Sequence, residues 1–194
     1  MRIALCTGLA IGMIALPICH PSAVAPLSAQ TPVNHDAQVL ADFNDRVKGY
    51  LALRDKVDGD APPLEPTRDP GKIEAAQKTL AALIRNARAG AKQGDIFAPE
   101  IEKTLRALLR PEVKGAAGAQ AKAEILDVKP MVELKVNAEY PSAEPVSTVP
   151  PTVLQALPPL PKDAGLEYRF VRKHMILLDT RANLIVDYLL NAIP

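Results

Sequence analysis

The sequence predicts an α+β fold, in which about three helices precede a small antiparallel sheet with proline-rich connections. Two observations lead to this prediction. Apolar residues recur every three or four positions between residues 36 and 110, as on one side of amphipathic helices. Between residues 166 and 189, short aliphatic runs alternate with turn residues, which is typical of the strands of a meander.

The first 29 residues have the features of a secretory signal peptide. Arg2 precedes the apolar run IALCTGLAIGMIALPIC, and a small-residue cleavage site follows at Ala29. The run is shorter than the roughly 20 residues that a membrane-spanning helix needs. Ile18 stands where lipoprotein signals carry a small residue, so lipidation of Cys19 is not expected. We therefore expect an exported protein, periplasmic or extracellular, whose mature chain begins with a flexible segment at residues 30–35.

The composition of the mature chain excludes several classes of function. Cleavage would remove both cysteines and Arg2, and would leave 22 basic and 22 acidic side chains. Without a thiol, the chain forms no disulfide, thiolate metal site or cysteine nucleophile. With no net charge, it lacks the basic excess that nucleic acid requires. We expect no cofactor, no nucleic-acid partner and no transmembrane anchor, but a protein partner in the cell envelope.

A helical part is expected over residues 36–125, and its first helix starts near residue 36. Asn34 or Asp36 is a suitable N-cap, and the turn residues 58–60 end the helix. The polar faces hold Asp42, Arg46, Lys48 and Arg54, and the apolar stripe comprises Val39, Phe43, Val47, Tyr50 or Leu51, and Val57. Such a stripe is expected to pack against a core.

Two further helices start at prolines. Asp69 precedes Pro70 at the start of the second helix, which is the pattern of an N-cap followed by the first helical residue. The third helix opens in the same way at residues 98–100 and is expected to break at Pro111. The Ala/Gly-rich stretch after it predicts only a weak helix that ends near residue 126. The apolar stripe of the second helix comprises Ile73, Ala76, Leu80, Leu83, Ile84 and Ala87.

A β-rich part is expected over residues 126–194. Residues 131–137 (MVELKVN) alternate apolar and polar side chains, so they predict a half-exposed strand that joins the sheet. A proline pair then starts a short helix, and the LPPLP stretch favours polyproline II geometry. Residues 166–189 form three antiparallel strands, in which at least one of Ile185 and Val186 is expected to be buried.

Several stretches resemble a family of uncharacterised exported bacterial proteins. They are IFAPEIEKTLRALL, VNAEYP, STVPPTVLQALPPLP and LEYRFVRKHMILLDTRANLIVDYL, and the likeness covers most of the mature chain. This resemblance implies no activity. The last ~30 residues, about one supersecondary unit, are also similar to small periplasmic modules involved in nickel and cobalt homeostasis. Both patterns carry a glycine where this chain has Arg172, so the turn is expected to be looser or shifted here.

The candidate chemical groups of the last stretch are His174, Asp179 and Asp187. With a hydroxyl from the loop at residues 142–148, they supply the residue types of a Ser/Thr-His-Asp hydrolase. No nucleophile elbow or other local signature accompanies them. His174 and Asp179 fall at predicted turns or strand ends, so we expect structural roles for them.

Metal sites are not expected either. Asp55, Asp58 and Asp60 lack the spacing of an EF-hand loop, and a helix-ending turn explains them better. The mature chain has only His35 and His174 as imidazoles, whereas a transition-metal site recruits several nitrogen or sulfur ligands. We therefore assign no catalytic, cofactor-binding or metal-binding residue.

The sequence favours a non-catalytic interaction or structural module of the cell envelope or extracellular space. Two alternatives stay open: a secreted hydrolase that uses His174, and a periplasmic protein that handles metal weakly. A binding module should show a contiguous apolar or mixed surface. An enzyme should show a pocket that holds His174, an acid and a hydroxyl.

Overall fold

A computed structural model describes residues 34–61, 65–129, 131–141 and 143–194, which belong to one compact unit. The predicted signal peptide, with Cys19, and Ser142 of the hydroxyl-bearing loop lie outside the described residues. Among the helices of these ranges, none has both the length and the apolar character that crossing a membrane requires.

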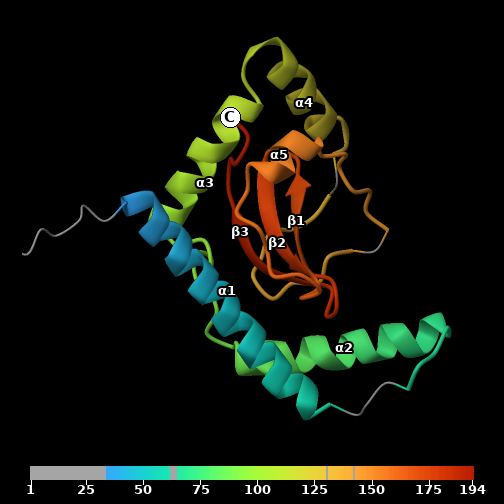
Figure 1. Ribbon diagram of the computed structural model, residues 1–194. Helices are drawn as coiled ribbons and strands as arrows, with labels where there is room; N and C mark the ends of the chain where they lie inside the picture. Colours follow the sequence, from blue (N-terminus) through green and yellow to red (C-terminus); the bar gives the residue numbers. More distant parts are fainter. Residues whose placement is uncertain (1–33, 62–64, 130, 142) are drawn as a thin grey trace, which may run out of the picture. The chain divides into compact units, whose positions relative to one another are not determined.

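In the described part of the chain, five helices precede three strands, which confirms the predicted α+β class (Figure 1). The helices are α1 (His35–Gly59), α2 (Pro70–Ala87), α3 (Pro99–Glu112), α4 (Gly115–Asp127) and α5 (Pro151–Gln155). The strands are β1 (Leu166–Val171), β2 (His174–Asp179) and β3 (Leu184–Leu189), which pair antiparallel in the order β1-β2-β3. The predicted meander is therefore present.

The predicted helix starts are confirmed at α1 and α2. The side chain of Asn34 accepts a hydrogen bond from the backbone N–H of Asp36, and that of Asp69 accepts one from Gly71. Each bond satisfies one of the N–H groups that a helix start leaves without a partner. His35 is already the first residue of α1, so the flexible segment predicted for residues 30–35 does not extend to it.

The third helix is longer than predicted, and the fourth ends close to its predicted position. α3 continues through Pro111 to Glu112, because a proline this close to the helix end disturbs only the last turn. The stretch that predicted a weak helix forms all of α4. Gly118 allows α4 to approach the end of α3, since a Cβ atom at this position would lie 2.5 Å from the carbonyl carbon of Val113.

The turn between β1 and β2 is tighter than the sequence predicts. Arg172 has a φ of 58°, in the left-handed region, although it is not glycine. A side chain in that conformation costs roughly 1–2 kcal/mol. The strands nevertheless pair up to Val171 and His174, which flank the turn. The expectation of a looser turn at Arg172 is therefore wrong, and pairing of the two strands offsets the local strain.

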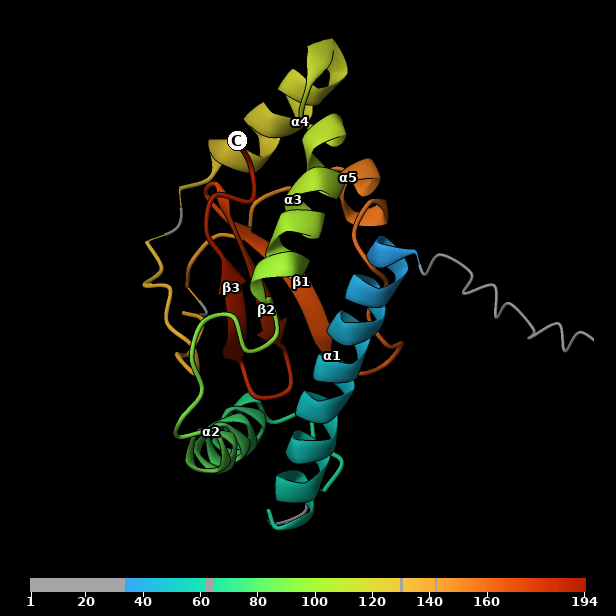
Figure 2. The same ribbon diagram turned by 90° about the vertical axis from the view of Figure 1, so that its left-hand side faces the viewer.

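One face of the sheet packs against the helices. Phe170, Leu177 and Val186 point to this side and share a core with buried residues of α1, α2, α3 and α4. Figure 2 shows α1 and α3 on the same side of the sheet. α2 lies at the end of the sheet where the β2–β3 turn is, and the Gln77 side chain donates a hydrogen bond to the Thr180 carbonyl there.

The opposite face of the sheet is also buried. Ile176, Leu178 and Ile185 form a second core there, which is covered by Tyr140 and by the partly buried residues of the segment 132–138. Ile185 and Val186 are both fully buried, one on each face. Enclosure on two sides explains why β2 and β3 each contain a continuous run of aliphatic residues, MILL and LIV, whereas the less buried β1 alternates with charged residues.

The strand predicted at residues 131–137 does not form. Burial does alternate along this segment, and its half-buried residues Val132 and Leu134 lie over the second core. The segment therefore packs on the face of the sheet through its side chains. Backbone pairing with the edge of β3 begins only at the last residue of this segment. There the N–H of Asn137 donates to the Ile185 carbonyl, and Glu139 then forms a β-bridge with Leu184. A period of two indicates an extended, half-buried chain, but not the direction of its hydrogen bonds.

Candidate functional site

The three candidate residues of the last strands do not form one site. His174 begins β2 and Asp179 ends it, so about 17 Å of strand separates them at roughly 3.3 Å per residue. Their side chains also lie on opposite faces of the sheet, because Val171, the partner of His174, belongs to the second core and Leu184, the partner of Asp179, to the first. The arrangement that a Ser/Thr-His-Asp hydrolase needs is not assembled around His174.

Asp179 holds the sheet to α1 through a buried polar network. Its Oδ2 accepts hydrogen bonds from the Tyr50 hydroxyl at 2.7 Å and from Arg54 Nη1 at 3.1 Å. Its Oδ1 accepts the backbone N–H groups of Arg181 and Ala182. The side chains of Arg54 and Asp179 are 4% and 0% exposed, so this ion pair is closed to solvent.

Apart from the Nε of Arg54, which has no hydrogen-bond partner among the described residues, the side-chain polar groups of Tyr50 and Arg54 have protein partners. Burial, with the charge of Asp179 as the second cause, raises the pKa of the Tyr50 hydroxyl, so the hydroxyl stays protonated and donates. Arg54 Nη1 also donates to the Ala164 carbonyl at 2.6 Å. The expectation that Arg54 lies on a polar face of α1 is wrong. It stands four residues after Tyr50 and continues the buried stripe of the helix.

A β-bulge turns Asp187 toward the helices. Leu177 pairs with Asp187 whereas the next residue, Leu178, pairs with Ile185, so Val186 is the extra residue of β3. The Asp187 carboxylate then accepts backbone N–H groups of Gly94, Ile96 and Phe97. Burial raises the pKa of Asp187, and these N–H groups counteract the rise. Asp187 fixes the loop between α2 and α3, and it has no substrate-facing surface because it is fully buried.

His174 anchors the end of the chain. Its Nδ1 accepts the backbone N–H of Asn191 at 3.0 Å, so Nδ1 carries no proton in this arrangement. Ala192 and Ile193 follow and are buried in the first core. Burial, together with the charges of Lys173 and Arg172, lowers the pKa of His174. The structural role expected for His174 stays a prediction, which its pH dependence tests.

Acid is expected to weaken this anchor. An unfolded histidine titrates near 6.5, and the folded protein holds His174 neutral below that value, so the unfolded chain binds more protons. Stability is then fully present above about pH 6.5 and decreases as the pH falls through the lowered folded-state pKa. Melting temperatures of wild type and His174→Asn should diverge between pH 7 and pH 5, with the larger fall in wild type. Asn offers an acceptor oxygen that does not titrate, so parallel curves would contradict this role.

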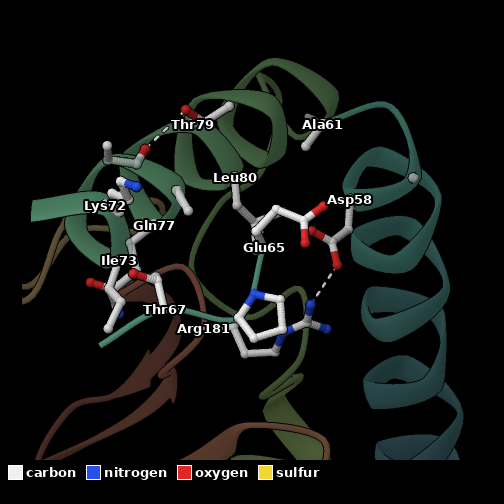
Figure 3. Close-up of a pocket in the computed structure, with 14 residues that line it drawn as sticks. Asp58, Ala61, Glu65, Thr67, Lys72, Ile73, Gln77, Thr79, Leu80 and Arg181 are labelled. Atoms are coloured by element: carbon white, nitrogen blue, oxygen red, sulfur yellow. Dashed lines mark hydrogen bonds and ion pairs between the residues drawn. The ribbon is translucent and has the colours of Figure 1, made fainter. Parts of the chain in front are cut away.

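A cleft of about 1100 Å³ lies elsewhere, between the C-terminal end of α1 and the N-terminal half of α2 (Figure 3). α1 contributes Asp58, α2 contributes Lys72 and Ile73, and the segment between the helices contributes Glu65. Arg181 reaches the cleft from the β2–β3 turn and forms an ion pair with Asp58. The volume of the cleft lies just above the range for small-molecule pockets, about 300–1,000 Å³.

Arg181 is placed in the cleft by the buried network. Asp179 holds its backbone N–H at 2.8 Å. The stem of Arg181 lies against Gly165, where a Cβ atom would come within 2.8 Å of its Cγ. Gly165 also has a φ of 64°, which favours glycine. The guanidinium is therefore presented by rigid elements, although the ion pair itself is partly open to solvent.

The polar groups that line the cleft are mainly charged side chains of both signs. Among the described residues that line it, there is no imidazole and no thiol, and its hydroxyl groups belong to Thr67 and Thr79. Thr79 donates its hydroxyl to the Ala75 carbonyl within α2. The described ranges also contain no cluster of histidine, cysteine and carboxylate side chains suited to a metal ion.

Comparison of the chain with protein-family models, with curated proteins and with solved structures gave no match. The candidate site therefore rests on geometry. The sequence did not predict the cleft. Its pattern placed Asp58 in the turn that ends the first helix, and it placed Ile73 on the side of the second helix that was expected to pack in the core. One signal was available: the apolar stripe of the second helix starts at Ile73, about two turns before Leu80, the first buried residue of that helix.

Proposed function

We propose that this protein is an exported, non-catalytic binding module whose cleft between α1 and α2 holds a segment of another polypeptide. The observation that supports the proposal most is the mixed lining of the cleft. Ile73, which is 40% exposed, lies beside charged side chains of both signs. A polypeptide segment also presents apolar and charged groups at close spacing, so it matches such a lining. The export step is inferred from the first 29 residues of the sequence.

The proposal agrees with the placement of the chemically reactive residues. His174, Asp179 and Asp187 each hold a backbone segment, and none of them lines the cleft. An enzyme instead concentrates its acid, base and nucleophile around one pocket. Within the described lining of the cleft, the exposed Ile73 offers an apolar contact beside charged groups, and a polypeptide segment can match both. Binding to an envelope protein is therefore favoured over hydrolysis.

A peptide selection tests the proposal. The mature protein is immobilised and exposed to a phage-displayed library of random peptides, and the enriched peptides are synthesised for fluorescence anisotropy. Ile73→Arg is expected to weaken their binding at least about tenfold, as for a central contact residue of an interface.

Met131→Arg is the matched control, because Met131 is 88% exposed and lies outside the cleft. Its affinity for the same peptides should equal that of wild type. The proposal fails if no peptide is enriched, or if the enriched peptides bind the Ile73→Arg and Met131→Arg proteins equally well.

A further inference from the structure

The charges of the cleft are separated along its length. Figure 3 shows Asp58 and Glu65 at one end and Lys72 at the other, with Arg181 directed toward Asp58. Because Arg181 forms an ion pair with Asp58, these two charges offset each other. Among the described residues, Glu65 and Lys72 form no ion pair with a protein side chain. One negative and one positive group therefore remain available to a ligand, at opposite ends.

The helix termini reinforce this separation. The carbonyl end of α1 carries partial negative charge, and its last turn, which contains Asp58, lines the end of the cleft near Glu65. The N–H end of α2 carries partial positive charge, and Lys72 lies in its first turn. The acidic end of the cleft is thus made more negative by α1, and the basic end more positive by α2.

These placements oppose helix stability. A carboxylate at the end of a helix and a cation at its start each have the sign that the helix dipole disfavours. Asp58 in α1 and Lys72 in α2 both violate the rule, and both line the same cleft. Violations of local preference that coincide in space are typical of functional sites, where the gain lies in binding.

We propose that the cleft selects a polypeptide segment by its charge order: a basic side chain binds beside Glu65 and an acidic side chain binds beside Lys72. Next to Lys72, an apolar side chain of the segment contacts Ile73. This inference rests on the proposed peptide-binding function and names the ligand class for that site. A segment with the reverse charge order would bring like charges together at both ends.

A charge-exchange experiment tests the inference. The probes are an enriched peptide that carries one basic and one acidic residue, and a copy in which the basic residue is replaced by Glu. Glu65→Lys is expected to weaken binding of the first peptide about tenfold, because like charges across an interface repel. The same variant should bind the second peptide as well as wild type binds the first. Lys72→Glu is expected to weaken binding of the first peptide by a similar factor. This variant should bind a third peptide, in which the acidic residue is replaced by Lys, as well as wild type binds the first.

Stability measurements separate a binding effect from misfolding. Lys72→Glu places a carboxylate in the first turn of α2, so its melting temperature should be equal to or higher than that of wild type while its affinity falls. Raising the ionic strength should reduce the affinity of wild type for the first peptide and reduce the difference between variants.

The two proposals fail in different ways. If Ile73→Arg abolishes binding but Glu65→Lys and Lys72→Glu leave it unchanged, the cleft binds polypeptide and the inferred charge order is wrong. If the charge variants weaken binding but the exchanged peptides do not restore it, selection by charge order is also overturned. If no peptide binds wild type, the proposed function itself is wrong.

Discussion

Asp179→Asn is expected to lower the free energy of unfolding by about 3–5 kcal/mol, the usual effect of removing one partner of a buried ion pair. The substitution keeps the size of the side chain but leaves the Arg54 guanidinium, which is 4% exposed, with only the exposed carboxylate of Asp55, at 3.4 Å, as an opposite charge. It also weakens the acceptor for the Tyr50 hydroxyl. Urea unfolding followed by circular dichroism measures the change.

Asp58→Asn is the matched control for that substitution. Asp58 also pairs with an arginine, but its side chain is 34% exposed and that of Arg181 is 45% exposed. Solvent screens such a pair, so its loss should cost less than about 1 kcal/mol. Equal effects of the two substitutions would show that Asp179 does not connect α1 to the sheet in the way described.

Ile185→Ala is expected to destabilise the protein by about 2–5 kcal/mol, because it removes a fully buried aliphatic side chain from the second core. Val186→Ala should also lower the melting temperature, but by less, since it removes fewer carbon atoms from the helix-side core. Such losses are a large share of the ~5–15 kcal/mol that holds a domain together. Thermal unfolding of the two variants measures both effects.

Glu167→Ala provides the control on the same sheet, because the Glu167 side chain is 41% exposed. Its melting temperature should stay near that of wild type. If Ile185→Ala melts at the temperature of this control, the segment 132–138 does not bury that face of the sheet. If only Val186→Ala melts at the temperature of the control, the helices do not bury the other face of β3.

The order of elements follows from local patterns. The caps at Asn34 and Asp69 and the stripe from Val39 to Tyr50 determine where α1 and α2 begin and which side is buried. These signals lie within a few residues of one another, so a single sequence reveals them. The meander was predictable for the same reason: its turns and aliphatic runs are neighbours in the chain.

The contacts that shape the site depend on distant residues. Arg54 and Asp179 are 125 positions apart, and nothing in the local pattern of either residue indicates the other. Similarly, the bulge at Val186 reverses the direction of Asp187, although the strand itself was predicted. The cleft depends on where α2 crosses the end of the sheet, which is a result of packing and not of helix periodicity.

The most direct test of the cleft as the binding site is the amide spectrum of the isotope-labelled protein during titration with an enriched peptide. We expect the backbone amide signals of Gly71, Lys72, Gln77 and Arg181 to shift with peptide concentration. The signals of Glu167 and Asn191, which lie on β1 and near the end of the chain, should remain in place. Shifts confined to the neighbourhood of His174 and Asn191, with those of the cleft unchanged, would contradict the proposed site.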